Sequence, residues 1–188
     1  MLSKLALGAI FLMLAGSQLS AQGRKPQTAL AIAFPDKDWG IEVNAPGFFV
    51  KGKGHKPDGR QYLFANNPKT GVILSVMLEQ SAKAAEGETC PDYLQHRLQS
   101  LSKLGFKAAD AQTAVVNSMD VLEYVIAKAP DMPVQQKNVF ACLAKDDIYV
   151  DVHLSKAHFQ AEDEAMLVDM LNNVRITSEI VPVAALAH

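Results

Sequence analysis

The stretch from Asn138 to Leu154 reads NVFACLAKDDIYVDVHL, two apolar segments joined by the polar residues Lys-Asp-Asp. Polar turn residues between two such segments predict a tight hairpin, with strands at 138–144 and 148–154. Strands joined by so short a turn pair antiparallel. The second strand alternates strictly, with Ile148, Val150, Val152 and Leu154 on one face and Tyr149, Asp151 and His153 on the other. We therefore expect an antiparallel sheet with one buried face and one ordinary polar face.

Working outward from this hairpin, alternation of apolar and polar residues predicts further strands on both sides. Asn67-Pro68-Lys69-Thr70-Gly71 is typical of the turn in a second hairpin. Ala45-Pro46-Gly47 is expected to end an early strand, and the glycine-rich and lysine-rich residues 51–59 predict a loop. The strands expected in addition to the first hairpin are 39–43, 47–50, 60–66, 72–79, 113–117 and 121–128, with a short one possible around Leu30 to Phe34.

Two helices are expected between and after these strands. Residues 90–104 carry leucines at helical spacing, Thr89 can cap the start, and Gly105 suits the end. Residues 161–174 form a second helix with acidic residues in its first turn. Strands, helix, strands, helix is the order of an α+β fold, an antiparallel sheet with helices packed on it. We expect a single domain over residues 39–176, preceded by an N-terminal segment at 22–38 and followed by a C-terminal tail at 177–188.

The first 21 residues have the pattern of a cleaved secretory signal peptide. Lys4 precedes an apolar run from Leu5 to Leu14, and small and polar residues follow up to Ala21. The alternative is an uncleaved membrane anchor, but a spanning helix needs about 20 apolar residues and this run is about half as long. The sequence therefore predicts export to a periplasmic or extracellular location, without stable membrane insertion after cleavage.

Composition and cysteine content narrow the function classes. Without its signal segment the chain has a net charge of about −3, and both signs are spread along it, so no nucleic-acid partner is expected. Cys90 and Cys142 are the two cysteines of the chain, and in an oxidising compartment they are expected to form a disulfide. A bridge across 52 positions would stabilise the fold by about 4 kcal/mol. The alternative is two unpaired thiols.

The order of elements resembles the PsbP-like α/β/α sandwich family, which includes the exported DcrB-like bacterial proteins. The resemblance is carried by WGIEV at 39–43 followed by APGF at 45–48, by VILSV at 72–76, by the helix after Cys90, by the paired strands between 139 and 154, and by the closing LNNVRI at 171–176. The family implies a scaffold that binds partners, mostly without catalysis. It brings no shared active-site motif to any residue of this chain.

Three constellations are candidate sites. Cys90 at a helix N-terminus could have a lowered thiol pKa, which would suit a thiol-dependent redox enzyme. Asp151 and His153 lie two apart on one strand, but a metal shell would need His55, His96 or His158 as well. The basic loop, Lys51, Lys53, His55, Lys56 and Arg60, could contact an anion or a partner, or be only a solvated loop.

The sequence favours a non-catalytic exported module that binds an unidentified protein partner or small ligand. No catalytic residue, metal or cofactor is assigned. The alternative function is a redox enzyme that uses Cys90, and a metal-binding protein is a third class.

Overall fold

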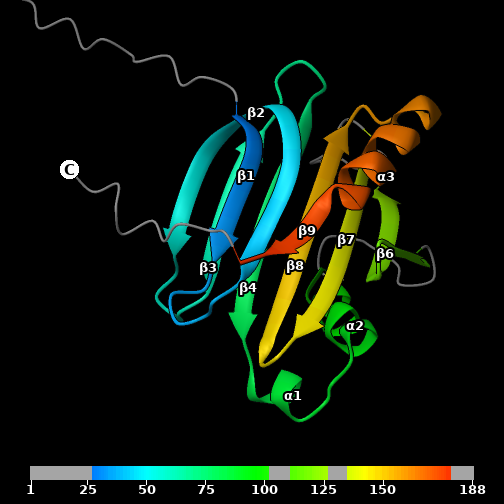
Figure 1. Cartoon of the computed structure of the whole chain (residues 1–188). Helices are drawn as coiled ribbons and strands as arrows, with labels where there is room; N and C mark the ends of the chain where they lie inside the picture. Colours follow the sequence, from blue (N-terminus) through cyan, green and yellow to red (C-terminus); the bar gives the residue numbers. More distant parts are fainter. Residues whose placement is uncertain (1–26, 102–110, 127–134, 179–188) are drawn as a thin grey trace, which may run out of the picture.

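The structure is a computed structural model that describes residues 27–101, 111–126 and 135–178. These residues form a single domain dominated by a nine-stranded antiparallel sheet (Figure 1). The expected signal peptide at 1–21, the final residues 102–104 of the first predicted helix, and the tail beyond residue 178 lie outside the described residues. The strands are β1 (Gln27–Ala33), β2 (Gly40–His55), β3 (Gln61–Asn66), β4 (Val72–Gln80), β5 (Gln112–Val116), β6 (Met119–Ile126), β7 (Gln136–Lys145), β8 (Ile148–Ala157) and β9 (Val174–Thr177).

The hairpin predicted from residues 138–154 lies in the middle of the sheet. The strand order is β1-β2-β3-β4-β8-β7-β6-β5, and β9 pairs with β2 off this path. β7 and β8 are antiparallel as predicted, but Lys145 belongs to β7 and pairs with Ile148, so only Asp146 and Asp147 form the turn. β8 also pairs with β4 over nine residues, so the second predicted hairpin joins the first one directly. The predicted α+β class with an antiparallel sheet holds at this level.

β2 differs from the prediction, because it runs unbroken from Gly40 to His55 through Pro46 and through most of the expected loop. Its first part pairs with β1 and β9, and its second part pairs with β3, so ladder hydrogen bonds hold it over its whole length. Gly52 and Gly54 leave room for the ring of Tyr62, which would lie 3.4 and 3.6 Å from a Cβ atom at those two positions. The glycines that predicted a loop therefore serve side-chain packing within a strand.

One face of the sheet carries the main hydrophobic core. Leu74, Val76, Val150 and Val152 are all at most 1% exposed, and they belong to the main hydrophobic core. This face is covered by β1, by the first part of β2, by β9 and by helix α3 (Glu164–Asn172), as Figure 1 shows. The sequence predicted helices as the covering layers, whereas here strands share this side of the sheet with one helix.

The structure also differs from the prediction at both ends of the predicted domain. The second predicted helix, 161–174, is a short 3-10 turn (Ala161–Asp163) followed by α3, and Val174 starts strand β9 instead. Val174 to Thr177 pair with the first residues of β2, which supply the ladder hydrogen bonds that a helix would have made internally. At the other end, β1 lies within the N-terminal segment 22–38, and its Leu30 and Ile32 are buried in the main core.

The opposite face of the sheet carries helix α2 (Cys90–Leu101), which follows the short helix α1 (Ala82–Ala85). α2 packs on β6, β7 and β8 through a second, smaller cluster that contains aromatic rings and both cysteines. Tyr149, predicted to lie on an ordinary polar face, is 1% exposed beneath this helix, and Asp151 is 2% exposed. That expectation was wrong because alternation identifies the two faces of a strand but not what covers them.

Candidate functional site

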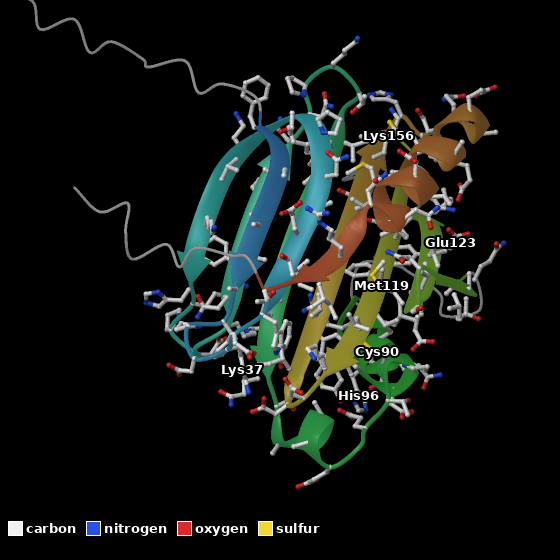
Figure 2. All side chains as sticks on the ribbon, in the orientation of Figure 1. Lys37, Cys90, His96, Met119, Glu123 and Lys156 are labelled. Atoms are coloured by element: carbon white, nitrogen blue, oxygen red, sulfur yellow. A yellow bond between two sulfur atoms is a disulfide. The ribbon has the colours of Figure 1, made fainter. Side chains whose placement is uncertain are left out.

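A disulfide fixes the start of α2 to the sheet. Cys90 at the first turn of the helix and Cys142 in β7 are bonded, with their Cα atoms 5.5 Å apart, so the predicted pairing is present. Figure 2 shows Cys90 at the side of α2 that faces the sheet. Both residues are buried, and the bond joins positions 52 residues apart in the sequence. One wall of any site beside α2 is thereby held covalently.

Local hydrogen bonds fix the same end of the helix. Thr89 and Asp92 form a reciprocal cap: the Asp92 amide donates to the Thr89 hydroxyl, and the Thr89 amide donates to the Asp92 carboxylate. Beneath this turn the Tyr149 hydroxyl donates to the backbone carbonyl of Glu88 at 3.0 Å and to its carboxylate at 2.9 Å. Tyr149 also stacks on Tyr93 with ring centroids 4.4 Å apart. The disulfide, the cap and the ring stacking together hold α2 in one position on the sheet.

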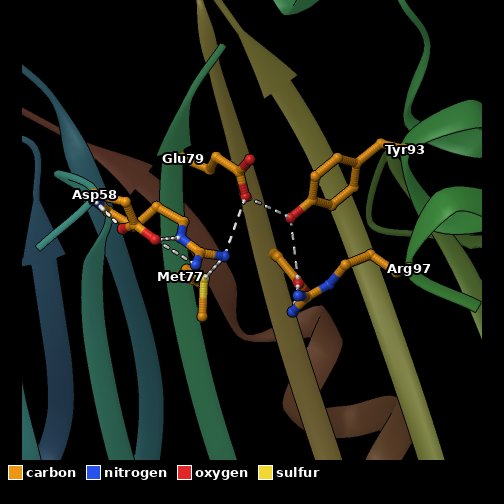
Figure 3. A network of polar contacts seen from close by, with 7 residues as sticks. Asp58, Met77, Glu79, Tyr93 and Arg97 are labelled. Carbon is orange, nitrogen blue, oxygen red and sulfur yellow. Dashed lines mark hydrogen bonds and ion pairs between the residues drawn. The ribbon is translucent and has the colours of Figure 1, made fainter. Parts of the chain in front are cut away.

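A chain of polar contacts runs from α2 to Arg60, the last residue of the predicted basic loop (Figure 3). Arg97 of α2 donates to the Asp151 carboxylate at 2.7 Å, and the Tyr93 hydroxyl lies 3.5 Å from the same oxygen. The Tyr93 hydroxyl also reaches Glu79 at 3.4 Å, and Glu79 lies 3.8 Å from the Arg60 guanidinium. Arg60 in turn pairs with Asp58.

Burial governs the electrostatics of this network. Desolvation raises the pKa of Asp151, although the nearby Arg97 guanidinium opposes the shift. The second oxygen of Asp151 is buried, and no described residue donates to it. Next to it, burial lowers the pKa of His153 to about 4. The His153 ring stacks on Phe140 at 4.0 Å, and its Nε2 lies 3.2 Å from the Asn138 side-chain oxygen. At neutral pH His153 is therefore an uncharged packing residue.

An open groove lies beside this network, between α2 and the hairpin of β5 and β6. Its volume is about 780 Å³, within the range of about 300–1,000 Å³ typical of ligand sites. Most of its lining is apolar, and the polar exceptions are two glutamines of α2, Thr113 and Asp120. The apolar lining consists of Pro91, Leu94, Leu98, Ala111, Ala114, Val115, Val121 and Leu122.

Two features of the groove stand out among the residues that the structure describes. Val115 is a large apolar side chain that is 71% exposed, the highest value among the exposed large apolar residues identified in the described ranges. The Asp120 carboxylate has no cation and no hydrogen-bond donor from any described residue. The hairpin that carries both is anchored elsewhere, because the Asn117 side-chain amide at its turn donates to the Val174 carbonyl at 2.7 Å.

The five residues of the predicted anion or partner contact do not converge on one point. The Lys53 side chain lies on the face of the sheet that β1 covers, where it donates to the Ala31 carbonyl at 2.6 Å. Arg60 lies on the opposite face and pairs with Asp58 and Glu79. Lys51 and His55 lie along β2 with exposed side chains. Lys56 is in the turn before Arg60, where its amide donates to the Arg60 carbonyl.

Among the described residues, no third potential metal ligand joins Asp151 and His153. Asp151 binds Arg97, His153 contacts Asn138, and the structure brings together no group of three or more potential metal ligands in residues 27–101, 111–126 and 135–178. The His96 side chain is 55% exposed and lies 3.4 Å from Glu88. Within the same ranges no helix has the length and apolarity needed to cross a bilayer.

Sequence reasoning missed the groove and the buried network. One signal was available for the network, since Tyr93 and Arg97 are four residues apart and so share the face of α2 that also carries the leucines. The groove has no comparable signal. It depends on where β5 lies relative to α2, and Thr113 to Val115 look like any short strand.

Comparison with solved structures supports the fold. The chain is similar to the solution structure of cyanobacterial PsbP (CyanoP) from Synechocystis sp. PCC 6803, with a TM-score of 0.51 and 13% identity over 86% of this chain and 100% of that one. It also matches a crystal structure from Bacteroides thetaiotaomicron, with a TM-score of 0.47 and 9% identity over 74% of this chain. This chain spans 46% of the Bacteroides protein's length. No protein-family model and no curated protein matches the sequence. At these identities the likeness shows a PsbP-like fold and nothing about activity.

Proposed function

We propose that the protein is an exported, non-catalytic binding module, and that its ligand site is the groove between α2 and the β5–β6 hairpin. One observation carries the proposal: an apolar-lined groove of about 780 Å³ stands open in the described structure with an exposed valine, Val115, at its wall. Burying that wall under an apolar ligand would be favourable by about 25 cal/mol per Å² of apolar surface removed from water. The ligand is a small apolar molecule or an apolar segment of a protein.

The disulfide supports both parts of this proposal. A bond between Cys90 and Cys142 is typical of oxidising compartments, which agrees with the signal-like residues 1–21. The bond also holds the α2 wall of the groove in place before any ligand arrives. A wall that is already ordered costs less entropy on binding than one that must be ordered by the ligand.

The thiol-dependent redox alternative needs Cys90 as an accessible thiolate. In the structure Cys90 is 5% exposed and bonded to Cys142, and Glu88 two residues before it would oppose a thiolate. Thiol titration of the native protein tests this alternative. A free, fast-reacting thiol with a low pKa would favour the enzyme over the binding module.

The binding proposal can be tested with a fluorescent apolar probe such as N-phenyl-1-naphthylamine. We expect saturable binding to the native protein and a loss of affinity of at least fivefold in Val115→Arg, which places a charge at the groove wall. Val168→Arg is the matched control, because Val168 is also an exposed valine but lies on α3, and no residue of α3 lines the groove. Equal binding by the two variants, or no saturable binding at all, would contradict the proposal.

A further inference from the structure

The groove opens beside an edge strand of the sheet. β5 is the last strand in the order and pairs with β6 alone among the described residues. Proteins usually protect such an edge with charged residues, proline or a bulge. β5 reads Gln-Thr-Ala-Val-Val, and its pairing with β6 is regular over all five residues. Within the part of the chain that the structure describes, none of these protections is present on β5, so its outer edge can accept another strand.

The hairpin turn determines which backbone groups point outward. Asn117 and Ser118 form a two-residue turn with φ values of 51° and 61°, between Val116 and Met119. The residues that flank a two-residue turn exchange both hydrogen bonds, and such pairs alternate along the ladder. Val116 and Ala114 therefore bond to β6. Thr113 and Val115 direct their N–H and C=O groups to the open edge.

The side chains of Thr113 and Val115 lie on the α2 side of the sheet, because the two residues pair with Leu122 and Asp120 of β6. Leu122 and Asp120 in turn pair with Phe140 and Cys142, which pack beneath α2. In an added antiparallel strand, the residues opposite them would present their side chains on the same face. Those side chains would therefore enter the groove between the added strand and α2. Edge and groove together offer what strand-addition sites use, with main-chain bonds for affinity and a pocket for alternate side chains.

The negative charge of Asp120 in the groove favours a basic side chain in the added strand. Asp120 lies directly opposite Val115 in the neighbouring strand and lines the groove with no cationic partner among the described residues. A residue of an added strand opposite Val115 would be two strand spacings from Asp120, about 10 Å between Cα atoms. A lysine or arginine can lie over the valine and place its charge near the carboxylate.

From these observations we propose that the occupant of the groove is an extended peptide that adds antiparallel to β5, with apolar side chains and one basic side chain facing α2. This proposal rests on the proposed function, because it takes the same groove as the binding site. It goes further in naming the partner class, a protein segment in extended conformation, and the contacts that would recognise it.

The test uses the heptapeptide acetyl-Thr-Leu-Thr-Lys-Thr-Leu-Thr-amide, titrated into isotope-labelled native protein and followed by NMR. We expect shifts confined to β5, β6 and α2, and slower hydrogen exchange at the Thr113 and Val115 amides. The Ala114 amide is already bonded to β6 and is expected to be protected before the peptide is added. The same peptide with N-methylated leucines and lysine should bind at least tenfold more weakly, because it keeps its side chains but loses its donors to β5.

Two protein variants test the same contacts from the other side. Val115→Pro removes one outward donor while leaving an apolar residue of similar size, and edge positions of this kind tolerate proline. It should bind the peptide at least tenfold more weakly than the native protein does. Val115→Ala keeps the donor and serves as the control. Asp120→Asn should remove the preference for the lysine peptide over its glutamate counterpart.

The outcomes separate the two proposals. If the native protein binds the naphthylamine but not the peptide, or binds the N-methylated peptide equally well, strand addition is wrong and the groove remains a ligand site. If neither probe binds, both proposals fail. If the protein instead forms a dimer that Val115→Pro dissociates, the edge accepts a second copy of this chain, and the peptide proposal is overturned.

Discussion

The two faces of strand β8 are held to their neighbours in different ways. Val150 and Val152 face a wholly apolar core and are fully buried. Tyr149 and Asp151, on the other face, are buried just as deeply but contact a disulfide, a guanidinium and hydroxyl groups. The first face is stabilised by the amount of apolar surface that it removes from water. The second is stabilised by particular bonds that fix where α2 lies.

This difference explains why the candidate site is on the second face. Apolar packing tolerates many arrangements, whereas a disulfide, a cap and an ion pair specify one position of a helix. The groove needs α2 at a defined distance from β5 and β6. A comparison of substitutions on the two faces can therefore show whether the second face supplies position, stability or both.

The largest effect is expected from removing the disulfide. Replacing both Cys90 and Cys142 with alanine should lower the free energy of unfolding by about 4 kcal/mol, because the unfolded chain is no longer restricted by a long cross-link. Urea denaturation of the native protein and the double variant measures the difference. Amide exchange should also become faster in α2 than in α3. Equal exchange in the two helices would mean that the disulfide stabilises the protein without positioning α2.

The next effect belongs to the apolar face. Leu154→Ala should lower the free energy of unfolding by about 3 kcal/mol, since Leu154 is fully buried and its truncation leaves a cavity. Ile73→Ala is a suitable control, because Ile73 lies one strand away and is 39% exposed. In contrast to the disulfide variant, Leu154→Ala should leave probe binding in the groove unchanged once the folded fraction is taken into account. A selective loss of probe binding would contradict the separate roles of the two faces.

The two faces also differ in how far the sequence predicted them. Alternation in Ile148 to Leu154 identified the apolar face residue by residue, because burial on that face needs only hydrophobicity at period two. The same alternation assigned Asp151 and His153 to an ordinary polar face. Their partners Arg97 and Asn138 come from other elements, and no local pattern encodes a contact between residues so far apart in the chain.

Predictions failed in β2 and at the C-terminal end for a related reason. Pro46 and the glycines at 52 and 54 carry turn signals, but pairing with β1, β3 and β9 overrides them. The pairing of Cys90 with Cys142 was predictable because the sequence predicts export and its two cysteines allow one intramolecular bond. The groove was not, because it is a property of how two elements are spaced.

A smaller effect should distinguish the partners of the buried ion pair. Arg97→Ala should lower the free energy of unfolding by about 2 kcal/mol, because it leaves Asp151 buried without a cation. Asp151→Asn should cost less, about 1 kcal/mol, since burial already favours the uncharged form of this residue. Thermal or urea unfolding of both variants at neutral pH gives the comparison. The reverse order would mean that the Arg97 charge, rather than the Asp151 charge, is the one that requires a partner.

The smallest effect is a dependence of stability on pH that comes from His153. Burial lowers the pKa of His153 to about 4, whereas an unfolded histidine titrates near 6.5. Between these two pH values the unfolded chain binds a proton that the folded chain does not, so stability falls as the pH is lowered through this window. The contribution should reach about 1–2 kcal/mol near pH 4, allowing for the partial exposure of the ring.

His153→Gln isolates this term, because glutamine keeps a hydrogen-bond donor for Asn138 and does not titrate. The difference in free energy of unfolding between the native protein and the variant should shift in favour of the variant from pH 6.5 to pH 4, and stay constant above pH 7.5. Asp151 acts in the opposite direction, since a raised carboxyl pKa makes protonation favour the folded state in acid. It remains in both proteins and largely cancels in the comparison. A difference that does not change with pH would mean that His153 is as accessible to protons in the folded protein as in the unfolded one, and the polar face would then be more open beside Phe140 than its stacking indicates.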